Sequence, residues 1–389
     1  MPSRRSTTSE VLVIGAGVMG CAIAWELSRR GAQVTVLERS VPGAEASSAA
    51  AGILGAQAET HAPSRGFALA LHSRARYAEW AKALIKATGI DIEYRRCGVL
   101  RVALDKLALR EAIREPRFQL ESGCKVDQLS ARQVRARVEV LTEAVQGAVA
   151  FPDDARVDPP KLLRALRIAG ERAGARFQSG MYVQRAVSHA GRVSGVALED
   201  GRLLSAAHVV VAAGSWSSLV QGVPLPASGV VPARGHIVEL QLATPLFAPV
   251  IMGPRCYLVP RDDGRLLVGS TLEFVGFRRE VTAGAVHTLL DAAIELVPAL
   301  REANLGGAWS SFRPYTQDGL PLIGETDTQG LIVATGHYRN GILLAPGTAD
   351  IVTALVLGKR PALEIGAFSP MRVQAERPRS AGTPLRSRL

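Results

Sequence analysis

Residues 9–40 constrain the fold most strongly, because they contain every part of a dinucleotide-binding βαβ unit in order. The apolar run 11–14 predicts a buried strand, and the turn Gly15-Ala16-Gly17-Val18-Met19-Gly20 leads into a predicted helix over 18–30. A second apolar strand over 34–37 ends in Glu38, where the ribose hydroxyl of an adenosine needs a hydrogen-bond acceptor. The sequence therefore predicts a site for an adenine dinucleotide.

Each glycine of this turn has its own expected task. Gly15 permits the turn, Gly17 lets a pyrophosphate approach the backbone, and Gly20 lets the helix pack closely on the strand. The phosphates are expected at the helix start, where free N–H groups and the positive end of the helix dipole attract anions. Glu38 disfavours a 2′-phosphate and hence NADP, but the unit alone leaves FAD and NAD open.

Composition limits the remaining classes of function. With 389 residues, 47% of them hydrophobic, and a mean hydropathy of +0.14, the chain is typical of a soluble α/β enzyme of two domains. No apolar run reaches the length of about 18 residues that a membrane helix needs. The net charge of +11 lies largely near the termini, without a nucleic-acid-binding motif, so we expect no nucleic-acid partner and disordered tails at 1–8 and 366–389.

The sequence lacks the residue patterns that are typical of several other kinds of site. The four cysteines form no CxxC pair and the seven histidines show no HxxxH spacing, which argues against a disulfide framework and a metal site and favours the cytoplasm. The segment Gly214-Ser215-Trp216-Ser217-Ser218 lacks the second glycine of a serine-hydrolase elbow.

Two further junctions of strand and glycine turn follow far along the chain. A buried strand runs into Gly214, and another, 331–336, leads through 337–346 into a helix ending near Leu357. Between the βαβ unit and Gly214, the small residues of 44–54 let a backbone run close to a flat ligand. The segment 221–312 is rich in proline and is expected to be less regular, with strands at 256–260 and 265–270.

We therefore predict an α/β protein with a discontinuous Rossmann-like nucleotide domain, built from 9–91, 151–220 and 313–365. The segments 92–150 and 221–312 are expected to form a second domain that contains an antiparallel sheet.

These landmarks together resemble the family of FAD-dependent amine and D-amino-acid oxidases, over about residues 9–365. The family-wide signals are the βαβ unit, the segment 209–216 and Arg313-Pro314-x-Thr316-x-Asp318-Gly319-x-Pro321. The segments 48–59 and 336–346 look closest to the glycine oxidases of thiazole (thiamine) biosynthesis. The resemblance implies a nucleotide domain of the glutathione-reductase type and FAD as the cofactor. The flavin is expected to be noncovalent, because no cysteine lies between 257 and 389, where the covalent sarcosine oxidases attach theirs.

The resemblance also assigns roles to individual residues. The segment 339–343 is expected under the pyrimidine end of the flavin, where a helix start stabilises negative charge. Gly214 is expected to bring a second backbone turn close to the cofactor. The expected FAD-binding residues are Gly15, Gly17, Gly20, Glu38, Ser47, Ser48, Gly52, Val183, Gly214, Arg339, Asn340, Gly341, Ile342 and Leu343.

Tyr257 and Arg313 match the family's binders of the substrate carboxylate, and Arg339 is the next candidate. A guanidinium offers a planar fork of donors to a carboxylate, and a phenol adds a third hydrogen bond. The alternatives are an interdomain ion pair for Arg313 and a core tyrosine for Tyr257. Leu272 stands where the family usually has a methionine, and Tyr315 replaces a glycine, so both are expected to reshape the pocket.

The activity that the resemblance implies is the oxidation of glycine, sarcosine or a small D-amino acid to an imine that hydrolyses, to glyoxylate in the case of glycine. Hydride passes to flavin N5, and O2 becomes H2O2. One alternative is a D-amino-acid or sarcosine dehydrogenase that reduces a quinone or a protein acceptor. Others are a flavin-binding regulatory protein without turnover and an NAD-linked dehydrogenase. Family members often form tetramers, so a homo-oligomer is expected.

Overall fold

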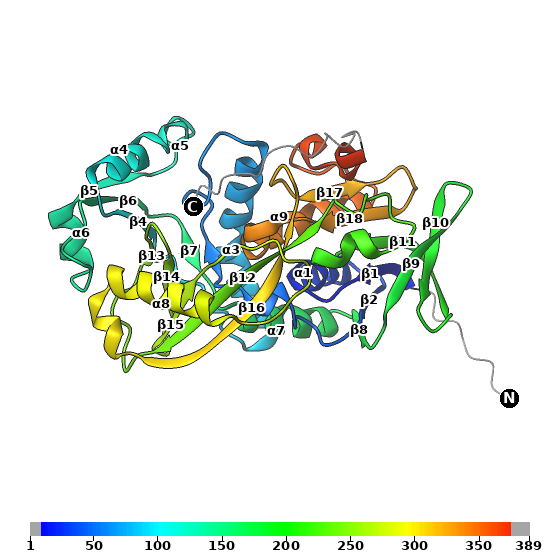
Figure 1. Cartoon of the computed structure of the whole chain (residues 1–389). Coiled ribbons are helices and arrows are strands. Elements are labelled where there is room, and N and C mark those ends of the chain that lie inside the picture. Colours follow the sequence, from blue (N-terminus) through cyan, green and yellow to red (C-terminus); the bar gives the residue numbers. More distant parts are fainter. Residues whose placement is uncertain (1–8, 375–389) are drawn as a thin grey trace, which may run out of the picture.

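The computed structural model describes residues 9–374, whose strands lie in two large sheets and one short pair (Figure 1). The first sheet has the order β17-β18-β11-β1-β2-β8, and every neighbouring pair is parallel except β17 with β18. A hairpin of β9 and β10 joins it through β11 and extends to one side of the molecule (Figure 1). The bounds are β1 (Ser9–Ile14), β2 (Val34–Glu38), β8 (Arg176–Ser179), β9 (Val183–His189), β10 (Arg192–Leu198), β11 (Leu203–Val211), β17 (Leu322–Glu325) and β18 (Leu331–Thr335).

The central strand β1 is apolar at consecutive positions because both of its faces are buried. Val11 and Val13 pack into the large core beneath the helices, whereas Leu12 and Ile14 pack into a second core on the other face. The helices over the first face are α1 (Val18–Ser28), α3 (Arg65–Thr88), α7 (Pro159–Arg172) and α9 (Gly341–Val356). This arrangement confirms the predicted α/β class.

Local signals set the ends of these helices. Gly89, in the left-handed conformation at φ 77°, ends α3. The side chain of Asp158 accepts a hydrogen bond from the backbone N–H of Lys161 at the start of α7, where Pro159 occupies the first turn.

The second sheet has the order β16-β12-β15-β14-β13-β4-β6-β5 and is antiparallel except between β13 and β4. Its core packs against α8 (Ala283–Leu296), and α4 (Lys106–Arg114), α5 (Arg117–Glu121) and α6 (Ala131–Arg137) lie near its far edge (Figure 1). The strands are β4 (Val99–Ala103), β5 (Asp127–Ser130), β6 (Gly147–Phe151), β12 (Val231–Gln241), β13 (Val250–Met252), β14 (Tyr257–Pro260), β15 (Arg265–Gly269) and β16 (Asn304–Tyr315).

The strands expected at 256–260 and 265–270 are β14 and β15, but the stretch 221–312, expected to be less regular, also contains β12, β13, α8 and most of β16. The two longest strands of the protein's described part, β12 and β16, pair along most of their length and run toward the first sheet (Figure 1). Glycines and charged residues interrupt their alternation, so their strand conformation depends on pairing with each other and with β15.

Short elements complete the fold. These are α2 (Ala46–Ala49), the pair β3 (Ile53–Leu54) and β7 (Ala155–Arg156), and the 3₁₀ turns η1 (Gly214–Leu219), η2 (Pro298–Glu302), η3 (Tyr338–Asn340), η4 (Gly366–Phe368) and η5 (Pro370–Gln374). The predicted disorder of the C-terminal tail is wrong for 366–374: Phe368 is buried, and the guanidinium of Arg372 donates to the Asp318 carboxylate and to the carbonyl of Leu320. The remaining tail residues, 1–8 and 375–389, lie outside the described part. Within residues 9–374, no helix is long and apolar enough to cross a membrane.

Candidate active site

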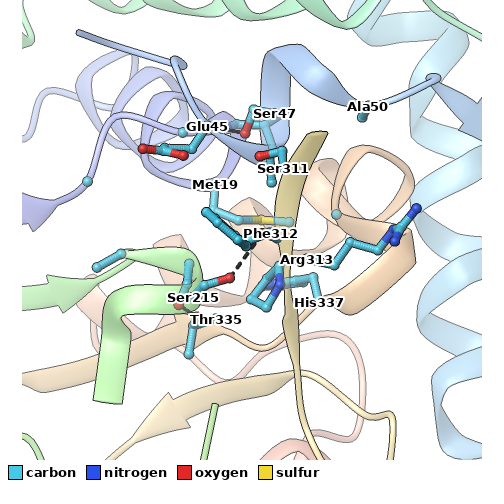
Figure 2. A pocket seen from close by; sticks show the side chains of 18 of the residues that line it. Met19, Glu45, Ser47, Ala50, Ser215, Ser311, Phe312, Arg313, Thr335 and His337 are labelled. Carbon is cyan, nitrogen blue, oxygen red and sulfur yellow. Dashed lines mark hydrogen bonds between the residues drawn. The ribbon is translucent and has the colours of Figure 1, made fainter. Parts of the chain in front are cut away.

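A long pocket lies where the carboxyl ends of the first sheet meet the second sheet. Figure 2 shows the segment of Glu45, Ser47 and Ala50 on one side and β16, with Ser311, Phe312 and Arg313, crossing in front. Ser215, Thr335 and His337 come from the ends of first-sheet strands. Segments far apart in the chain thus form one continuous lining.

The βαβ turn has the close packing that its glycines predicted. Gly15 has a φ of 99°, and a Cβ there would lie 2.7 Å from the carbonyl oxygen of Ala212. A Cβ on Gly20 would overlap the carbonyl oxygen of Gly15, because the helix crosses the strand at that point. The Glu38 carboxylate accepts hydrogen bonds from the backbone N–H groups of Ala16 and Ser40, each at 2.9 Å. Glu38 therefore ties the turn to the end of β2 while it lines the pocket.

The start of α1 faces the same pocket. Gly17 is its N-cap residue and offers no side chain, and the Ser47 hydroxyl accepts a hydrogen bond of 2.9 Å from the backbone N–H of Val18. A Cβ on Gly17 would lie 3.2 Å from that hydroxyl oxygen, so the space beside the helix start exists because residue 17 is glycine. The exposed backbone, the hydroxyl and the helix dipole fit the pyrophosphate of a dinucleotide.

Most of the expected cofactor-binding residues lie in this lining. The lining contains Gly15, Gly17, Glu38, Ser47, Gly52, Val183, Gly214, Arg339, Asn340, Gly341 and Ile342. Gly20, Ser48 and Leu343 are not part of it. The Leu343 side chain is 1% exposed and packs into the large core, so it does not face a ligand in the pocket.

Arg313 lies half-buried on β16 at the second-sheet end of the pocket. Its guanidinium donates to the carbonyl oxygen of Thr271 at 3.1 Å and to the Ser270 hydroxyl at 2.5 Å. Among residues 9–374 no carboxylate lies within ion-pairing distance of Arg313. This contradicts the alternative that Arg313 forms an interdomain ion pair. The pocket thus contains a fixed cation whose charge no acidic side chain among the described residues neutralises.

Two glycines make room for the predicted carboxylate binders. A Cβ on Gly235 of β12 would overlap the guanidinium of Arg313, and a Cβ on Gly269 of β15 would overlap the Tyr257 ring. Tyr257 begins β14, is half-buried and lines the pocket. Neither glycine shows its role in the sequence, because each faces its side chain only after the strands pair.

Arg339 has a different environment. Its Nε lies 3.2 Å from a carboxylate oxygen of Glu59, and the attraction of that carboxylate raises the pKa of Arg339. Glu59 also lines the pocket and was not among the predicted site residues, although it ends the segment 48–59. Since Arg339 is paired, Arg313 is the better anchor for an incoming carboxylate.

His337 is buried, and its Nε2 lies 3.0 Å from the Thr348 hydroxyl. Burial lowers the pKa of His337 to about 3, so the ring is neutral near neutral pH.

Leu272 is 43% exposed, and neither it nor Tyr315 lines the pocket. The Tyr315 ring packs edge-on against Tyr338, which does line it, at a centroid distance of 5.0 Å. Tyr315 therefore contacts a lining residue, Tyr338, without lining the pocket itself. Within the described part of the chain, no group of three metal-binding side chains comes together.

The dinucleotide motif that lines the pocket agrees with the comparisons with known proteins. The family model DAO, described as FAD dependent oxidoreductase, matches residues 10–355. The chain therefore belongs to this family of FAD-dependent oxidoreductases, which confirms the predicted relationship and FAD as the cofactor.

The chain is similar along most of its length to individual proteins of this family. Glycine oxidase from Geobacillus kaustophilus is 37% identical over 368 residues, which cover 93% of this chain and 97% of that protein. The crystal structure of glycine oxidase from Geobacillus kaustophilus superposes with a TM-score of 0.90 and covers 94% of this chain and 99% of that one. The bifunctional protein ThiO/ThiG of Synechocystis is 39% identical over 94% of this chain, which spans 54% of that longer protein.

Proposed function

We propose that this chain is an FAD-dependent glycine oxidase that also accepts other small amines such as sarcosine or D-alanine. Glycine loses two electrons and two protons to become an imine, which water hydrolyses to glyoxylate and ammonia. Molecular oxygen takes up the two electrons and two protons and becomes H2O2. The observation that carries this proposal is the unpaired, half-buried Arg313 in the pocket of an FAD-dependent oxidoreductase.

The residues of the pocket divide into two groups. FAD, held by the lining of the first sheet, supplies the electron-accepting chemistry. On the cofactor side, the backbone around Gly15, Gly17 and Gly214, the Ser47 hydroxyl and the Glu38 carboxylate are the groups we assign to binding it. The N-terminus of α9 adds a partial positive charge beside the lining residues 339–342, where it stabilises negative charge on a bound ring.

On the substrate side, we assign Arg313 and Tyr257 to the carboxylate. The arginine holds the zwitterion in one orientation and offsets the hydration that its carboxylate loses on entering the pocket. His337 is neutral, is bonded to Thr348 and takes no proton. His337 is therefore not the group that removes the proton of the substrate amine.

The names of the relatives support glycine as the substrate and thiamine biosynthesis as the pathway. Glycine oxidase from Geobacillus kaustophilus matches nearly end to end, and the bifunctional ThiO/ThiG proteins match over about half of their length. We infer that the product serves thiazole formation in thiamine biosynthesis. We also infer that the chain acts in the cytoplasm as a homo-oligomer with noncovalent FAD. The four cysteines of the described part are all free, and none lines the pocket, which supports a reducing compartment and a noncovalent flavin.

Steady-state assays with glycine, sarcosine, D-alanine, D-proline and D-phenylalanine test the proposal. The purified protein is expected to be yellow, with absorption near ~450 nm as in oxidised flavoproteins. We expect oxygen uptake and equimolar peroxide, with the highest kcat/KM for one of the first three substrates. Dye reduction without oxygen uptake would indicate the dehydrogenase, and a flavin that anaerobic glycine fails to bleach would indicate a regulatory protein. The highest kcat/KM for D-phenylalanine would refute the assignment of substrate.

A further inference from the structure

Two side chains of the second-sheet region hold the backbone of the cofactor-side segment 49–52. The indole Nε1 of Trp309, on β16, donates a hydrogen bond of 3.0 Å to the carbonyl oxygen of Ala49. The guanidinium of Arg261, which follows β14, donates a bond of 2.7 Å to the carbonyl oxygen of Ala51. The residues between and beside these carbonyls, Ala50 and Gly52, line the pocket, and Figure 2 shows Ala50 at its edge.

Arg261 is an unusual residue to find in this place. It is 1% exposed, and its nearest carboxylate, that of Asp158, lies 4.0 Å away. Its second bond, of 2.9 Å, runs to the carbonyl oxygen of Val157, whose own N–H donates to the carbonyl of Gly52. Burying a guanidinium costs free energy, which carbonyl acceptors offset only when they are well placed. This arrangement indicates that Arg261 is kept for the position of the backbone it binds.

The same strands carry the two predicted carboxylate binders. Tyr257 begins β14, the strand that Arg261 follows, and Arg313 lies four residues beyond Trp309 on β16, on the same face of that strand. Ala51, Tyr257 and Trp309 also pack in one small hydrophobic cluster between the two parts of the pocket. A shift of either strand would therefore move a carboxylate binder and the cofactor-side backbone together.

We propose that Arg261 and Trp309 are positioning residues that fix the segment 49–52 against Tyr257 and Arg313. They couple the affinity for FAD to the affinity for the substrate carboxylate. The inference rests on the proposed function, because it takes Tyr257 and Arg313 as the carboxylate site. Neither side chain has to touch the substrate: both act through the backbone carbonyls they bind.

The variant Trp309→Phe tests this most cleanly, because it keeps an aromatic ring and removes the N–H donor. FAD affinity is measured by reconstituting apoprotein, and carboxylate affinity by titrating the holoenzyme with acetate and following the flavin spectrum. Loss of one hydrogen bond is expected to raise the dissociation constant of FAD by between about 2- and 13-fold. We expect the dissociation constant of acetate and the KM for glycine to rise as well, with a smaller change in kcat.

Trp80→Phe is the matched control. Trp80 is also buried, and its indole N–H has no hydrogen-bond partner within the described residues, so the same substitution there removes packing without removing a bond. We expect it to lower the melting temperature and to leave the FAD and acetate constants at their wild-type values.

Arg261→Lys keeps the charge but reaches one carbonyl instead of two, so it is expected to weaken FAD and acetate binding less than Arg261→Met. Arg255→Lys, at an exposed arginine paired with Asp291 and Glu295, is the control and should match the wild type.

Unchanged FAD affinity in Trp309→Phe, or an equal loss in Trp80→Phe, would overturn the proposal. So would weaker FAD binding with an unchanged acetate constant, since no coupling would then exist. Failure of the proposed function is a separate result: a wild type that binds FAD and acetate but does not oxidise glycine refutes the substrate and leaves these binding measurements decisive.

Discussion

Replacing Arg313 with leucine tests the link between the pocket and the reaction. The guanidinium is half-buried, uses two hydrogen bonds to the Thr271 carbonyl and the Ser270 hydroxyl, and has no acidic partner within the described residues. Removing one partner of a desolvated charge pair costs about 3 to 5 kcal/mol, and partial exposure places this site at the lower end. A loss of about 3 kcal/mol corresponds to a rise of roughly 10²-fold in the KM for glycine.

The assay is oxygen uptake as a function of glycine concentration, together with the flavin content and melting temperature of each variant. Arg313→Leu is expected to keep its FAD, because no residue of the βαβ turn contacts this side chain in the structure. Arg313→Lys is expected to recover part of the affinity, since it keeps the charge and loses the two-pronged geometry. A near-normal KM in Arg313→Leu would refute the reasoning and move the carboxylate site to Arg339. Loss of FAD or unfolding would assign Arg313 a structural role instead.

Three further perturbations have expected outcomes. Gly235→Ala should raise the KM for glycine and change the melting temperature little, because the atoms nearest to the new methyl group belong to the movable end of Arg313; an unchanged KM would show that Arg313 does not bind substrate from this position. Gly17→Val should give soluble protein largely without FAD, since its side chain fills the space beside the start of α1, and full flavin occupancy would contradict that location of the phosphates. Burial raises the pKa of the Asp154 carboxyl to about 6, above its unfolded value, so this group's contribution to stability should fall as the pH rises from about 4 to about 6. Asp154→Asn should reduce the pH dependence of the free energy of unfolding, measured by chemical denaturation across that pH range. An unchanged pH dependence would contradict the assignment.

The cofactor half of the molecule was predictable because its signals are local. In the βαβ unit, a buried strand, a glycine turn, a helix and an acid-terminated strand follow one another within 9–40, and each adopts its structure next to its neighbours in sequence. The helices α3 and α7 likewise have an apolar face and end signals of their own. The motif around Arg313 marked that residue by type and by resemblance, and the structure places it in the pocket.

The rest of the site was decided by tertiary structure. The strands β12 and β16 form because they pair with each other, and their glycine-interrupted sequences show no regular alternation. Gly235 leaves room for the Arg313 guanidinium, and Glu59 neutralises Arg339, only after segments far apart in the chain meet. Hydrophobic periodicity and turn chemistry describe a chain's local preferences. Whether a cation stays free to bind a carboxylate depends on which distant side chains lie beside it, and only the folded structure determines that.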